Sequence, residues 1–109
     1  MPRPGDVLLI PFPYTDLTTN KRRPVLVLRH ADSFDDFLAA AITSQPGHED
    51  VPPLYQGDFQ EGILPKPSYL RTTKLYTLNR RIAASRFGRL TPSDFQLAQG
   101  TICAVLGCE

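Results

Sequence analysis

The chain has 109 residues, of which 41% are hydrophobic and 21% charged, with a formal net charge of +1. This is the composition of one soluble globular domain, which would bury roughly two thirds of the surface of its unfolded chain. No apolar run approaches the roughly 20 residues of a membrane span, and the N-terminal residues show no signal-peptide pattern. We therefore expect a single domain over residues 1–109, located in the cytoplasm.

The small net charge hides a strong segregation of acids and bases. Residues 32–61 hold seven of the eleven acids and no Lys or Arg, whereas residues 71–89 hold six of the twelve bases and no acid. A basic face is therefore compatible with a near-neutral chain.

Cys103 and Cys108 lack the spacing of a metal site and are expected to be reduced, partly buried thiols.

A strand, a basic turn and a second strand open the chain. Val7–Phe12 and Pro24–Leu28 are apolar runs of strand length, rich in residues that favour β-structure. The turn between them ends in three consecutive cations, Lys21, Arg22 and Arg23. Cations fixed at the start of a strand suggest an anion-binding site, although a solvated turn is the alternative.

A third strand is expected at Phe37–Ile42, with a short helix as the alternative because three of its residues are alanines. Pro46 and Gly47 limit the run to strand length. Residues 46–68 carry five prolines and three glycines, so we expect mostly loop, with a short edge strand around Leu54–Gln56.

The last third of the chain should contain β-structure and then a helix. Ser68–Leu78 suits one or two strands, Asn79–Ser85 a helical turn, and Phe87–Leu90 closes the basic section. The helix is defined by Thr91 as N-cap, Pro92 and Asp94 in the first turn, and Gly107 as the stop. Its apolar stripe is expected to be core: Phe95, Ala98, Ile102, Val105 and Leu106.

Three groups of residues could bind or transform an anion. Arg23 offers a rigid fork of donors suited to a phosphate. Thr43, Ser44 and Gln45 follow the third strand and could hydrogen-bond a phosphate or a base edge, although simple turn chemistry is the alternative. The third group combines cations with aromatic rings, the pattern that holds single-stranded RNA, or else forms a solvated strand face: Tyr69, Arg71, Lys74, Tyr76, Arg80 and Arg81.

Two rival kinds of site have weaker support. His30 and His48 could act as acid and base in RNA cleavage, but both are expected in polar loops. The acidic residues between positions 32 and 50 match no calcium or zinc pattern. We therefore expect neither a metal nor another cofactor.

Several motifs in series resemble one known family. GDVLLIPFP is followed by TDL in the loop, then by RPVLVL and AAITSQ, and later by KPSYLRTTKLYTLNRRI and GRLTPSDF. In this order and spacing they are similar to the MazF/PemK family of toxin endoribonucleases, in particular its PemK-like branch. The chain departs from better-known members at Lys74–Thr77, where a Gln and an Arg often precede the threonine.

The resemblance implies a mainly β, SH3-like antiparallel barrel with a C-terminal helix and short additional helical turns. It also implies a homodimer, held inactive by a cognate antitoxin, that cleaves single-stranded RNA such as mRNA at short motifs without a metal. The family's catalytic arginine falls on Arg23 and its catalytic threonine on Thr43. We add the residues expected to bind the RNA: Tyr14, Lys21, Arg22, Ser44, Gln45, Arg71, Lys74 and Tyr76.

A non-enzymatic role is the alternative. The same type of barrel occurs in toxins that bind a protein target such as DNA gyrase and cut no nucleic acid. Arg23 together with Thr43 favours the nuclease, because a pure binding module has no need of both at these positions.

Overall fold

A computed structural model of the chain describes residues 2–11, 22–44, 53–54, 59–61, 68–82 and 85–107. In these ranges the chain forms seven strands, one 3-10 turn and one helix. In chain order these are β1 (Asp6–Pro11), β2 (Arg22–Arg29), β3 (Asp36–Thr43), β4 (Pro53–Leu54), β5 (Phe59–Glu61), β6 (Ser68–Asn79), η2 (Arg80–Ile82), β7 (Ser85–Leu90) and α1 (Pro92–Leu106).

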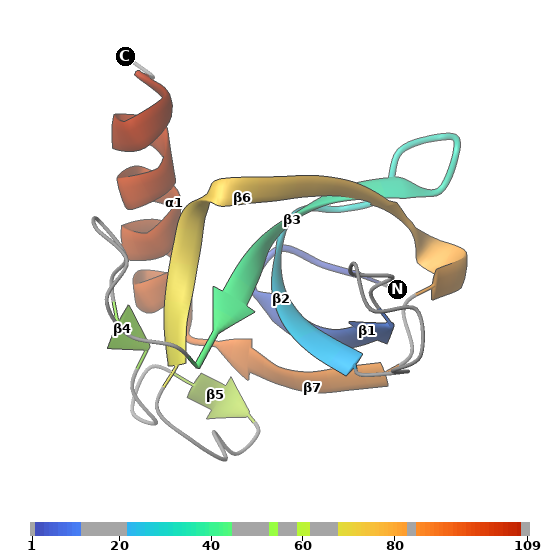
Figure 1. Cartoon of the computed structure of the whole chain (residues 1–109), viewed down its shortest axis with the longest axis horizontal. Helices are drawn as coiled ribbons and strands as arrows, with labels where there is room; N and C mark the ends of the chain where they lie inside the picture. The colour runs from blue at the N-terminus through green and yellow to red at the C-terminus, as the bar shows by residue number, and fades with distance from the viewer. Residues whose placement is uncertain are drawn as a thin grey trace.

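The strands form one sheet in the order β4-β6-β3-β2-β1-β7-β5. All of its strand pairs are antiparallel. The sheet is strongly curled, so that β6 arches over the top and β7 runs along the bottom of the view in Figure 1, with α1 on one side. The prediction of a mainly β fold with a C-terminal helix is confirmed, and η2 is one of the expected helical turns.

The opening pair of strands is confirmed. β1 pairs with β2 over Val7↔Leu26 to Pro11↔Arg22. The PVLVL block lies in the middle of the sheet, where Val25, Leu26 and Val27 are fully buried. Such a strand is apolar on both faces, which explains why the block shows no alternation of polar and apolar residues.

The alanine-rich run is a strand and not a helix. β3 lies between β2 and β6, and Ala39 and Ala40 are fully buried there. Partners on both sides supply the backbone hydrogen bonds, so tertiary context overrides the helical preference of alanine. The short edge strand predicted around Leu54–Gln56 overlaps at Leu54 with β4, which pairs with the start of β6 at one edge of the sheet.

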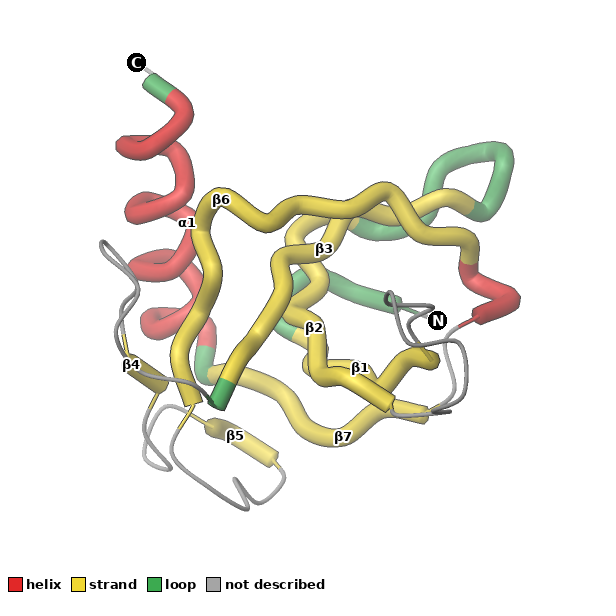
Figure 2. The backbone as a smooth tube through the Cα atoms, viewed as in Figure 1, coloured by secondary structure: helices red, strands yellow, loops and turns green. Residues whose placement is uncertain are grey.

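Ser68–Asn79 forms one strand with an irregularity in its middle. Ala41 pairs with Arg71 but its neighbour Ala40 pairs with Leu75, so residues 72–74 are inserted between two consecutive pairs. Extra residues of this kind bend a strand. Figure 2 shows β6 turning sharply near its middle.

Two strands were missed in the sequence. β7 includes the predicted closing segment and pairs with β1, and β5 pairs with β7 at the end of the sheet. β5 has three residues in a section rich in proline and glycine, and β7 contains Gly88 and two arginines. Neither run carries the apolar pattern by which a strand is recognised.

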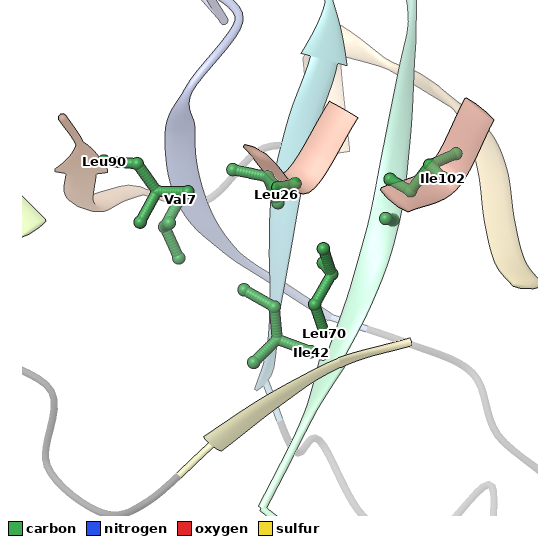
Figure 3. Close-up of a cluster of buried hydrophobic side chains, with 8 residues drawn as sticks. Val7, Leu26, Ile42, Leu70, Leu90 and Ile102 are labelled. Carbon is green, nitrogen blue, oxygen red and sulfur yellow. The ribbon is translucent and has the colours of Figure 1, made fainter. Parts of the chain in front are cut away.

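Buried side chains lie on both faces of the sheet. Figure 3 shows the cluster under α1, in which five strands and the helix meet through Val7, Leu26, Ala40, Ile42, Leu70, Leu90, Ala98 and Ile102. The second cluster is made by the alternate residues of the same strands: Leu8, Ile10, Val25, Val27, Phe37, Ala39 and Leu78. Because successive side chains point to opposite faces, it lies on the face away from α1.

The ends of α1 are as predicted. Thr91 Oγ1 accepts a hydrogen bond of 3.2 Å from the backbone N–H of Asp94, and Gly107 ends the helix with a left-handed φ of 79°. The described part of the chain holds no helix with the length and apolar character of a membrane span. Cys103 is half-buried, as expected, and Cys108 lies outside the described residues.

The apolar stripe of α1 is core only in its first part. Ala98 and Ile102 are buried and Phe95 packs against them, but Val105 and Leu106 are 40% and 59% exposed. The prediction was wrong for these last two residues. The reason is visible in Figure 1, where the C-terminal end of α1 projects past β6 and has no sheet beneath it.

Candidate functional site

The two residues that the sequence singles out, Arg23 and Thr43, lie at the same end of neighbouring strands. The pairing of β2 with β3 runs as far as Val25↔Ala41. Arg23 and Thr43 each lie two residues beyond this pair, within β2 and β3 respectively. There the start of β2 and the end of β3 lead away from each other (Figures 1 and 2). We call this opening, formed by residues 22–24 and 42–43, the fork.

Each side of the fork is held by its outer neighbour. Arg23 pairs with Ile10 of β1, and Thr43 pairs with Tyr69 of β6. Pro24 has no backbone N–H, so it cannot donate a ladder hydrogen bond at the point where the strands separate. The fork therefore opens between two paired, and so firmly positioned, parts of the sheet.

Arg23 and Thr43 also project to the same face. By alternation Arg23 shares the face of Val25 in β2, and Thr43 shares the face of Ala39 in β3. Val25 and Ala39 both belong to the cluster on the face away from α1. The Arg23 side chain is exposed and that of Thr43 is half-buried. A cation and a hydroxyl thus border one opening on one face, an arrangement that suits a phosphate group.

Strand β6 adds polar residues to this face. Arg71 pairs with Ala41 and Tyr76 with Ala39, so both lie on the same face as Thr43. Lys74 is exposed and falls in the irregular segment between them. In the part of the chain that the structure describes, neither Arg71 nor Lys74 has an acidic partner.

The other predicted residues are placed less completely. Arg22 starts β2 opposite Pro11, and Ser44 is exposed directly after β3. The remaining three lie outside the described residues: Tyr14, Lys21 and Gln45.

The rival sites do not gain support. His30 is exposed and follows β2 at the end opposite to the fork, and His48 lies outside the described residues. Among the described residues there is no group of three or more histidine, cysteine or carboxylate side chains that could hold a metal.

The acids of the turn between β2 and β3 have structural roles instead. Asp32 Oδ1 accepts hydrogen bonds from the backbone N–H of Phe34 and Asp36, at 2.8 and 3.1 Å. Asp35, which has a φ of 65°, lies 3.5 Å from the guanidinium of Arg80. Asn79 Nδ2 donates to Asp36 Oδ1 at 3.1 Å and so ties the turn to β6.

Several solved structures have the same fold. A mycobacterial endoribonuclease in complex with its cognate antitoxin is 17% identical, with a TM-score of 0.75 over 99% of this chain and 95% of that one. MazE-MazF from Deinococcus radiodurans is 19% identical, with a TM-score of 0.74 over 99% and 97%. The Mycobacterium tuberculosis toxin MazF-mt6 is 18% identical, with a TM-score of 0.70 over 95% and 98%. At these identities the similarity shows a shared, MazF-like fold.

The family is shown by the sequence itself. Residues 3–106 match the family described as PemK-like, MazF-like toxin of type II toxin-antitoxin system. The chain therefore belongs to the PemK/MazF toxin family, as its motifs predicted. No curated protein sequence matches the chain closely enough to be counted as a relative.

Proposed function

We propose that the protein is an endoribonuclease toxin that cleaves single-stranded RNA at short sequence motifs. The observation that carries the proposal is the fork, where Arg23 and Thr43 project to one face from neighbouring strands of a chain of this family. Solved proteins of the same fold include endoribonucleases. A single domain over residues 1–109, a cytoplasmic location and a closed SH3-like barrel belong to this proposal as expectations.

The chemistry follows from groups already present on RNA. The 2'-oxygen attacks the neighbouring phosphorus, and the bond from phosphorus to the 5'-oxygen breaks. The 2'-hydroxyl loses a proton in this step, and the leaving 5'-oxygen gains one. The products are a 2',3'-cyclic phosphate and a 5'-hydroxyl. Since the nucleophile belongs to the substrate, the protein chiefly supplies alignment and charge, and the reaction needs no metal.

Arg23 and Thr43 have separate roles in this scheme. The Arg23 guanidinium stabilises the extra negative charge of the phosphorane, for which its rigid set of donors is suited. Thr43 donates a hydrogen bond to a non-bridging oxygen or passes a proton to the leaving oxygen. The hydroxyl of Thr43 is too weak an acid to lose its proton at neutral pH, so without assistance it cannot serve as the general base. The remaining predicted residues would hold the strand: Tyr14, Lys21, Arg22, Ser44, Gln45, Arg71, Lys74 and Tyr76.

The central test is incubation of the purified protein with total RNA, with and without EDTA. We expect cleavage in both cases and fragments that end in a cyclic phosphate. A DNA strand of the same sequence should stay intact because it lacks the 2'-hydroxyl. Loss of RNA cleavage in EDTA, or cleavage of the DNA, would contradict the scheme. No cleavage at all would favour the non-enzymatic alternative, a module that binds a protein such as DNA gyrase.

Partners form the second part of the proposal. The solved MazE-MazF structures are complexes, which supports a cognate antitoxin for this chain. A homodimer is supported by α1, which carries three of the five exposed large hydrophobic side chains of the described residues, namely Leu97, Val105 and Leu106. α1 has no lysine or arginine and only one acid, Asp94, whereas a helix that faces water normally carries charges on its outer side.

The dimer can be tested by replacing two of these side chains. We expect light scattering to give twice the 12.2 kDa mass of the chain for the wild type. Leu97→Lys with Val105→Lys should give the mass of one chain, because charges would have to be buried in the interface. Ser33→Lys adds a charge in the turn between β2 and β3, away from α1 (Figure 1), and should remain dimeric. A wild-type protein with the mass of one chain would rule the homodimer out.

A further inference from the structure

Tyr69 belongs to the group of cations and aromatic rings noted in the sequence, but it has no individual role in the proposed function. Tyr69 is the direct partner of Thr43 in the pairing of β3 with β6. Directly opposed residues of antiparallel strands have Cβ atoms about 4.5–5.5 Å apart and project to the same face. We propose that Tyr69 is a base-stacking subsite for the nucleotide next to the scissile phosphate, and that Arg71 binds the adjoining phosphate. The inference rests on the proposed function and names a contact within the same site.

The pairing fixes which face Tyr69 occupies. The pair next to Thr43↔Tyr69 is Ile42↔Leu70, and both of these side chains are buried in the cluster under α1. Tyr69 therefore projects to the opposite face, the one that carries Arg23 and Thr43 at the fork. Figure 1 shows the end of β3 beside the start of β6, at the same edge as β4.

Packing separates Tyr69 from the other tyrosine on this face. Tyr76 packs against the second hydrophobic cluster, so its ring has a structural role. Tyr69 belongs to neither of the two clusters that the described residues form, and it is half-buried between its two direct partners, Thr43 of β3 and Pro53 of β4. A half-buried ring that is not used by the described core can offer one of its faces to a ligand.

The residues along β3 and β6 indicate the kind of ligand. Three consecutive pairs on this face set a small residue of β3 against a larger polar one of β6: Thr43 with Tyr69, Ala41 with Arg71, and Ala39 with Tyr76. Arg71 lies two residues from Tyr69 on the same strand and face. An aromatic ring next to a guanidinium is how proteins hold a base and its phosphate in single-stranded RNA.

The test measures binding without cleavage. A pool of short 2'-O-methyl oligonucleotides of random sequence, with 2-aminopurine among its bases, cannot be cut because the 2'-oxygen is blocked. Tyr69→Leu keeps an apolar side chain but removes the ring, and should weaken binding by about 5- to 100-fold, the loss of one stacked base. Tyr69→Phe keeps the ring and should bind like the wild type and quench 2-aminopurine fluorescence to the same extent.

Three measurements keep the inference falsifiable. Thr77→Ala, an exposed position on the same strand, should bind like the wild type. Tyr69→Leu should unfold at the wild-type temperature, whereas a purely structural role would lower it. Wild-type affinity in Tyr69→Leu, or an equal loss in Tyr69→Phe, would overturn the subsite. Cleavage of RNA by the wild type is measured in parallel, so an inactive protein with Tyr69-dependent binding would refute only the proposed nuclease.

Discussion

Replacing Arg23 with alanine should lower the rate of RNA cleavage by about a hundredfold or more, the usual effect of removing one electrostatic stabiliser of a transition state. The expected loss is large because the guanidinium would act on charge that develops only as the phosphorane forms. Arg23→Lys should recover part of the rate, since an ammonium supplies the charge without the planar set of donors. The measurement is single-turnover cleavage of an end-labelled RNA.

A matched variant distinguishes this role from general electrostatic attraction. Arg29 is exposed on the same strand but at the end opposite to the fork. Arg29→Ala changes the net charge by the same amount and should cleave RNA at nearly the wild-type rate. A folded Arg23→Ala protein with near-normal cleavage, or equal losses in both variants, would remove Arg23 from the mechanism.

The second large effect concerns stability and the start of β1. Asp6 is 1% exposed, and its Oδ1 accepts a hydrogen bond from Arg89 Nη1 and lies 4.0 Å from Arg86 Nη1. Its Oδ2 accepts from the backbone N–H of Arg3 at 2.9 Å. This carboxylate joins the N-terminal segment to β7. If this carboxylate is removed, the positive charges of Arg89 and Arg86 lose the negative charge that compensates them in the fold.

We therefore expect Asp6→Ala to lower the free energy of unfolding by about 3 kcal/mol, near the lower end of the range for buried pairs. The lower end applies because Arg89 and Arg86 are partly exposed and can be hydrated in the variant. For a chain of this size the thermal midpoint should fall by roughly 10–20 °C. Thermal unfolding followed by circular dichroism measures the effect.

Asp35→Asn serves as the control for Asp6. Asp35 also pairs with an arginine, but both side chains are much more exposed than that of Asp6, at 48% for Asp35 and 39% for Arg80. Such surface pairs contribute about 0–1 kcal/mol, and asparagine tolerates the left-handed φ of 65° at this position. The variant should unfold close to the wild-type midpoint. If Asp6→Ala were no less stable than Asp35→Asn, the buried pair would have no role in holding β7.

Elements with a complete local signal could be predicted from the sequence. Thr91, Pro92 and Gly107 mark the ends of α1 through backbone groups of the same helix, so no distant residue is needed to recognise them. The PVLVL block was recognised because β-branched residues and leucine favour a strand that is buried on both faces. β5 escaped prediction because its three residues are strand only through pairing with β7.

The residues of the candidate site carry no complete local signal of this kind. Arg23 and Thr43 were identified through the family resemblance, since the basic turn and the Thr-Ser-Gln segment are each compatible with ordinary loop chemistry. Nothing in the sequence relates Thr43 to Tyr69, because strand register depends on the pairing of β3 with β6 and on the three residues inserted after Arg71. A shift of one residue would have moved Tyr69 to the opposite face, which carries the cluster under α1.

The sequence by itself determined the family, the central strands, both ends of the helix and the concentration of six of the twelve bases in residues 71–89. These depend on local preference and on motifs that lie in order along the chain. Only the tertiary structure decided where β2 and β3 part, which side chains share the face of the fork, that Asp6 is buried against Arg89, and that Val105 and Leu106 project beyond the sheet. The physical reason is that burial and strand pairing depend on contacts between two segments that are distant in the sequence. Secondary-structure propensity depends on one segment alone.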